Sequence, residues 1–277
     1  MRFDMSFYLI DHRMIALVMV MVLALAGEIG FRLGCRGRDS KESFRSLMSG
    51  TGAAMLGLLG LLLGFTLAMA VSRWDTRRDV IVNEANAIGT VWLRAGLLEE
   101  PLRADLRNAL RSYTDARIAL GGSRSDRAAL RAAQRNSESL HASIWSTIKR
   151  ASQPGRSPAV LTSLINSANE LIDIHELRLA SIENYLPAPL FLLLLTVAAF
   201  SMGFLAWAFG AANQGGRAAI VILGLLIGAV LLLIMDVNRP QRGSLDIGVE
   251  SLERVGETMA VPTQYEHLGK GSFKHKS

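Results

Sequence analysis

Long stretches without a charged residue constrain this chain more than any other feature. No Asp, Glu, Lys or Arg occurs in Met14–Gly27, Ser46–Ser72, Asn184–Gly216 or Ala218–Met235. A bilayer core about 30 Å thick needs roughly 20 apolar helical residues to cross it, because backbone polar groups find no water there. The sequence therefore predicts an all-α integral membrane protein with four transmembrane helices.

The first stretch is the shortest and has two interpretations. As a span it continues to Arg32, whose long side chain can reach the interface, and Glu28 is spaced to pair with Arg32 along one helix face near the membrane boundary. As a cleaved signal peptide it would end at Ala24-Leu25-Ala26. The leader before it carries two acidic and two basic residues. Since a signal peptide has a basic leader, we expect a span that stays.

The region between the second and third spans, residues 73–184, is charged and mixed in sign. Its apolar residues recur at helical spacing, so the second span is predicted to run on as one helix to about Leu98. Further helices are expected at Pro101–Leu120 and Ser125–Ser152, and another begins at Pro158, because proline suits the first turn of a helix. This insert is predicted to be helical throughout.

Other residue types argue against several classes of site. Cys35 is the only cysteine, and the five histidines show no metal-binding spacing. No nucleophile and base are spaced for catalysis, so the chain is not predicted to be an enzyme. No cofactor and no metal site are predicted either. The net charge of +6 is spread along the chain, and no block is basic enough to predict nucleic-acid binding.

The second span is unusually rich in small residues. It contains five glycines, Gly50, Gly52, Gly57, Gly60 and Gly64. Small residues let helices approach closely. The span is therefore expected either to pack tightly inside its own bundle or to line a pore shared by several copies of the chain.

Three short segments carry a family resemblance. Leu63-Gly64-Phe65 followed by Val71-Ser72-Arg73-Trp74 resembles the pore helix of the bestrophins. Arg73–Arg78 with Asn83–Gly89, and Met235–Gly243, are similar to segments of the bacterial bestrophin-like family of membrane proteins. The order of spans and insert also resembles that family. We expect structural polar roles for Glu28 and Arg32 and, within or beside these segments, for Glu84, Asn86, Asp236 and Arg239.

The resemblance implies a function. Bestrophins are pentameric anion channels whose second helix carries three apolar neck residues around the axis, and these fall on Gly57, Leu61 and Phe65 here. The spacing of four keeps them on one helix face, and a ring of apolar side chains can gate by dewetting. Since Gly57 is not large, and Leu58 stands where a proline is usual, the gate is expected to rest on Leu61 and Phe65.

Three arginines follow the second span, and they have two interpretations. Arg73, Arg77 and Arg78 could raise the local anion concentration at a vestibule mouth. They could equally reach lipid headgroups or pair with acidic residues of the same helix. Animal bestrophins bind calcium through an acidic run after the last span, but here Asp236 is followed by Asn238 and Arg239. No calcium site is predicted.

The domain organisation follows from these segments. We expect an N-terminal tail and two spans in residues 1–72, a cytoplasmic helical insert in 73–184, two spans in 185–236 and a cytoplasmic tail in 237–277. The resemblance and a slight basic excess place both termini and the insert in the cytoplasm.

Location and partners follow from the same resemblance. The chain is expected in the bacterial inner membrane, as a homo-oligomer, pentameric by resemblance, with the lipid bilayer and inorganic anions as partners. The alternative is a non-conducting scaffold or sensor whose insert binds a partner.

Overall fold

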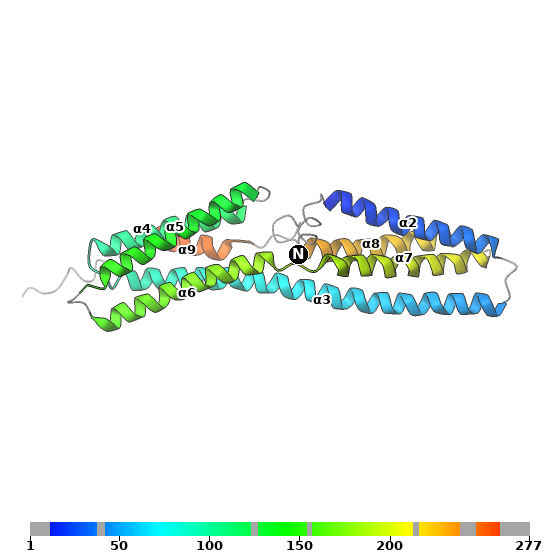
Figure 1. Cartoon of the computed structure of the whole chain (residues 1–277), viewed down its shortest axis with the longest axis horizontal. Helices are drawn as coiled ribbons and strands as arrows, with labels where there is room; N and C mark the ends of the chain where they lie inside the picture. The colour runs from blue at the N-terminus through cyan, green and yellow to red at the C-terminus, as the bar shows by residue number, and fades with distance from the viewer. Residues whose placement is uncertain are drawn as a thin grey trace, which may run out of the picture. The chain divides into compact units, whose positions relative to one another are not determined.

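The computed structural model describes residues 12–37, 42–122, 127–153, 157–212, 216–238 and 248–260. Every regular element in these ranges is an α-helix. The helices are α2 (His12–Arg36), α3 (Glu42–Ala95), α4 (Leu102–Gly122), α5 (Arg127–Ala151), α6 (Pro158–Glu183), α7 (Ala188–Ala211), α8 (Arg217–Val237) and α9 (Glu250–Ala260) (Figure 1). The prediction of an all-α fold is confirmed.

Four of the described helices are long and apolar enough to cross a membrane. They are α2, α3 and α8, which contain three of the uncharged stretches, and α7, which lies within the fourth. The predicted number of candidate spans is therefore confirmed by length and hydropathy among the described residues.

The chain divides into two compact units, one formed by residues 1–75 and 184–245 and the other by residues 76–183 and 246–277. The first unit contains α2, the N-terminal part of α3, α7 and α8. Its apolar core includes Leu23, Leu59, Leu194 and Leu231, one from each of these helices. Each span therefore buries one face against the others and exposes much of the rest, as expected of helices in lipid.

α2 and α7 approach each other closely through glycine. A Cβ atom built on Gly30 would collide with the backbone of Gly203, and one built on Gly34 would collide with the backbone of Trp207. Larger residues at these two α2 positions would force the helices apart, because their neighbours are backbone atoms that cannot rotate away. The first stretch is thus packed as an integral part of this bundle.

The second unit has its own apolar core. The C-terminal part of α3 contributes Ile88 and Val91, α4 contributes Leu106 and Leu110, and α6 contributes Leu171, all fully buried. α9 covers part of α4 through two further buried residues, Leu252 and Met259. The insert thus forms a packed helical bundle.

Most predicted helices are confirmed, with one addition. α3 continues through the second span and ends at Ala95, and α6 begins at Pro158 as predicted. α9 was not predicted from the sequence. The domain boundaries and the cytoplasmic placement of the insert stay predictions.

Candidate functional site

One face of α3 is exposed along the whole apolar stretch. Leu61 is 55% exposed and Phe65 is 65% exposed, and Gly57 lies on the same exposed face. The opposite face carries Leu59 and Leu63, which are buried in the core of the first unit. The predicted neck residues are therefore directed away from their own bundle.

The predicted vestibule arginines differ in their surroundings. Arg73 donates to the Asn184 side chain at 2.8 Å. Arg77 is 3% exposed, and its Nε donates to the Ser181 carbonyl at 3.0 Å. Arg78 is exposed. Burial thus separates Arg77, which holds the end of α6, from Arg78, which faces outward.

Glu84 lies at the centre of a buried charge cluster in the second unit. Its Oε1 accepts hydrogen bonds from Arg117 Nε and from the Tyr113 hydroxyl, both at 2.7 Å. Its Oε2 accepts from Arg178 Nη1. One carboxylate therefore joins α3 to α4 and α6. Two guanidinium groups against one carboxylate leave this trio with a net positive charge.

Two histidines extend the cluster. The Tyr113 hydroxyl lies 3.3 Å from His175 Nδ1, and the His175 and His141 rings meet edge to face with centroids 4.5 Å apart. Since the Tyr113 proton goes to Glu84, His175 Nδ1 must carry its own proton to complete this bond. Burial and the nearby Arg117 charge lower the pKa of His175 to about 4, and burial together with the Glu84 charge raises the pKa of Tyr113.

His175 is fully buried. Its hydrogen bond to Tyr113 makes it part of the polar cluster as well as of the core. The low pKa of His175 keeps it neutral at neutral pH, so it adds no further positive charge beside Arg117 and Arg178.

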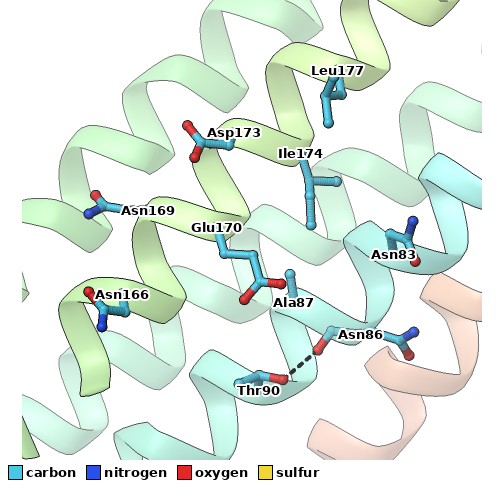
Figure 2. A pocket seen from close by; sticks show the side chains of 10 residues that line it. All are labelled: Asn83, Asn86, Ala87, Thr90, Asn166, Asn169, Glu170, Asp173, Ile174 and Leu177. Carbon is cyan, nitrogen blue, oxygen red and sulfur yellow. Dashed lines mark hydrogen bonds between the residues drawn. The ribbon is translucent and has the colours of Figure 1, made fainter. Parts of the chain in front are cut away.

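A polar groove runs between α3 and α6 in the second unit (Figure 2). It encloses about 710 Å³ and is lined by Asn83, Asn86, Ala87, Thr90, Asn166, Asn169, Glu170, Asp173, Ile174 and Leu177. The Glu170 side chain extends from α6 toward Ala87 on α3, as Figure 2 shows. Thr90 donates to the Asn86 carbonyl at 2.9 Å. Amide groups and two carboxylates thus make this surface hydrophilic.

Two of the remaining predicted polar residues contact each other. Glu28 accepts a hydrogen bond from Arg32 at 2.7 Å, and the structural role of this pair stays a prediction. Asp236 is half-buried near the end of α8. Arg239 lies outside the described residues. Among the described residues, no group of three His, Cys, Asp or Glu side chains is arranged to hold a metal ion.

Sequence reasoning missed the partners of Glu84. Arg117 and Arg178 lie 33 and 94 residues from it along the chain, and nothing in the local sequence singles them out among the arginines of the insert. A helical projection of α4 offers the one available signal, because Arg117 falls on the same face as the apolar Leu106, Leu110 and Tyr113. A charge on a buried face needs a partner.

Comparisons with known proteins agree with this architecture. Residues 15–252 match the Bestrophin-like domain family. Comparison with curated proteins gave no match. A crystal structure of a bacterial bestrophin homologue from Klebsiella pneumoniae, a point variant, is 13% identical with a TM-score of 0.63, covering 86% of this chain and 97% of that chain.

Two further crystal structures show the same fold. One variant of a membrane protein is 15% identical with a TM-score of 0.64, covering 88% of this chain and 99% of that chain. Another is 12% identical with a TM-score of 0.65, covering 85% of this chain and 97% of that chain. Since the family match spans most of the chain, including all four candidate spans and the insert, the protein belongs to the Bestrophin-like domain family of membrane proteins.

Proposed function

We propose that the protein is an oligomeric, anion-permeable channel of the bacterial inner membrane, with several copies of α3 around one axis. The observation that carries this proposal is the exposed apolar face of α3. Leu61 and Phe65 are among its most exposed large side chains. In a ring of copies they would form an apolar constriction that gates by dewetting.

Three glycines on or beside the exposed face of α3, Gly57, Gly60 and Gly64, would let two copies of the helix approach closely. We call them the glycine flank. Apart from its chain neighbours and the backbone of its own helix, a Cβ atom built on Gly57, Gly60 or Gly64 would meet no atom of the described residues within 4 Å. These glycines therefore serve no close contact within their own bundle, in contrast to Gly30 and Gly34. Small residues at a helix surface are typical of contacts between membrane helices, and a neighbouring copy of α3 is the partner we propose.

The neck is tested by shortening its side chains. Leu61→Ala with Phe65→Ala should raise halide flux in reconstituted vesicles, because a wider ring is wetted more easily. Ile222→Ala with Leu226→Ala, which shortens two exposed side chains of α8 at the same spacing, is the matched control and should leave flux unchanged. An assembled neck variant that passes no ions would contradict the channel.

The groove favours a second candidate function. The groove has a volume of about 710 Å³ and carries the carboxylates of Glu170 and Asp173. These negative charges suit a protein partner with basic residues. With such a partner, the protein would be a non-conducting scaffold or sensor. Under this alternative the neck substitutions give no flux, and Glu170→Gln with Asp173→Asn weakens partner binding.

A further inference from the structure

Two arginines from different spans share one carboxylate at the same end of the first unit. Arg32 on α2 donates to Glu28 Oε1 at 2.7 Å, and Arg217 Nη2 on α8 lies 3.7 Å from the same oxygen. The Arg217 guanidinium also lies over the Phe31 ring, 4.7 Å from its centroid. Both guanidinium groups therefore lie beside one carboxylate, so two formal positive charges face one negative charge.

These arginines keep much of their surface open. Their side chains are 72% and 66% exposed, respectively, so Glu28 occupies only a part of their hydrogen-bonding capacity. A guanidinium group has five N–H donors. Arg217 is also the first residue of α8, where the helix dipole favours a negative charge. The donors that remain are suited to an anionic oxygen ligand.

Apolar side chains continue from the arginine pair along both helices. Met21 and Leu25 on α2 and Val221 and Leu225 on α8 are exposed. From Arg32 back to Met21 the helix rises about 16 Å, and from Arg217 to Leu225 about 12 Å. Half of a bilayer core is about 15 Å thick. The cationic pair and the apolar surface therefore match the headgroup and the acyl chains of one lipid leaflet.

We propose that Arg32 and Arg217 form a binding site for the phosphate of an anionic phospholipid, whose acyl chains lie along the exposed faces of α2 and α8. Arginine binds phosphate oxygens through paired N–H donors. Near a membrane surface each basic residue contributes about 1 kcal/mol toward anionic lipid, which corresponds to about a fivefold preference. The headgroup would bridge two spans that Glu28 already holds together.

The apolar surface distinguishes a lipid from a free anion. Inorganic phosphate would contact the two guanidinium groups alone, whereas a phospholipid also covers Leu25 and Val221. A lipid should therefore stabilise the protein at concentrations where inorganic phosphate does not. This site is separate from α3, so its occupancy does not depend on whether the protein conducts ions.

The test is lipid retention by the full chain. Protein purified in mild detergent is exchanged into mixed micelles that contain equal amounts of phosphatidylglycerol and phosphatidylcholine, and bound lipid is counted by native mass spectrometry. The parent should retain phosphatidylglycerol in clear excess. Arg32→Gln and Arg217→Gln should each reduce this preference about fivefold, and the double variant should abolish it.

Two controls separate lipid binding from a purely structural ion pair. Glu28→Gln breaks the pair but keeps both arginines, so it should retain phosphatidylglycerol as well as the parent or better. Arg254→Gln removes an exposed arginine of α9 and should change nothing. The helix content, measured by circular dichroism, shows whether each variant is folded. If the double variant does not fold, the two single variants still test the proposal.

Three results would overturn the proposal. The parent could retain both lipids equally, the arginine variants could keep the parent's preference, or Glu28→Gln could lose it as they do. Thermal unfolding provides a fourth check. If inorganic phosphate at the same concentration raised the unfolding temperature as much as phosphatidylglycerol does, the ligand would be a free anion and not a lipid.

Discussion

Glu84 on α3 and Arg117 on α4 form an ion pair in which neither side chain is exposed to solvent, with Nε and Oε1 2.7 Å apart. Arg178 on α6 binds the other oxygen of the same carboxylate. Removing the carboxylate would therefore leave two buried guanidinium groups without compensation. A buried charge without its partner is far more costly than the intact pair is favourable.

Glu84→Gln should accordingly lower the free energy of unfolding of the second unit by about 3 to 5 kcal/mol. Arg150→Gln is the matched control. It breaks the Arg150–Asp105 pair, which has a similar distance of 2.8 Å but exposed side chains, and such a pair contributes about 1 kcal/mol or less. Denaturant unfolding followed by tryptophan fluorescence measures both. Equal losses in the two variants would contradict the buried cluster.

The histidines of the same cluster predict a pH dependence. His175 has a pKa lowered from 6.5 to about 4, so the unfolded chain takes up a proton in this window before the folded chain does. The contribution of His175 to the free energy of unfolding should be present in full above pH 6.5. It should be lost as the pH is lowered toward 4, by up to about 1.4 kcal/mol per pH unit for one such histidine. Burial lowers the pKa of His141 in the same direction.

His175→Gln checks this prediction. The substitution removes the titrating group, so the slope of unfolding free energy against pH between 6.5 and 4.5 should become smaller, whatever the variant's stability at pH 7. Ordinary carboxylates titrate near pH 4, which leaves this window to the histidines. A variant with the slope of the parent would show that His175 does not contribute.

The helices could be predicted from the sequence because their signals are local. The uncharged stretches marked four spans, and Ser157-Pro158 marked the start of α6 at the observed residue. α9 was missed, although Leu252, Val255 and Met259 follow helical spacing and pack in the core of the second unit. This short pattern follows the last span, in residues 237–277, which were predicted only as a tail.

The site could be predicted only in part. The exposure of Leu61 and Phe65 agrees with their predicted face, since helical spacing is again local. Whether Arg73, Arg77 and Arg78 are buried or exposed depends on contacts with residues distant in sequence. Arg77 lies four residues from Arg73 and one from Arg78, yet it alone is buried, because the end of α6 covers it. Only the folded chain distinguishes these three side chains.

Arg77 and Arg78 should therefore respond differently to the same substitution. Arg77→Gln removes the bond to the Ser181 carbonyl and should lower stability by about 1 to 3 kcal/mol. Arg78→Gln changes an exposed charge and should leave stability nearly unchanged but lower the preference for anions over cations. Reversal potentials in an ion gradient measure that preference, and unfolding measures stability. An Arg78 variant with unaltered selectivity would remove Arg78 from the vestibule.

The topology has a direct test. We expect both termini and the insert in the cytoplasm, so reporter fusions at Ser277 and at Gly121 should both give a cytoplasmic signal. The positive-inside rule gives little help here, because basic residues flank the spans on both sides in similar number. A periplasmic signal at either position would overturn the arrangement, and the arginine pair at Arg32 and Arg217 would then face the cytoplasmic leaflet.

The last prediction concerns assembly through the glycine flank of α3. Among the described residues of one chain, a Cβ atom at Gly60 or Gly64 would meet no atom within 4 Å beyond its chain neighbours and the backbone of its own helix, so the isolated fold should accept a larger side chain at either position. Replacing glycine by alanine inside a helix should even stabilise it, by about 0.5 to 1 kcal/mol. Any harm from such a substitution must then come from a neighbouring copy.

Gly64→Ala and Gly64→Leu make a matched pair for this purpose. If a second α3 packs against the flank, the alanine variant should assemble like the parent or slightly less well, and the leucine variant should dissociate, because its side chain fills the space of the neighbouring helix. Light scattering in detergent measures the mass of each. Both variants should keep the helix content of the parent. A leucine variant that remains fully assembled would place the contact between copies elsewhere, and the neck formed by Leu61 and Phe65 would lose its support.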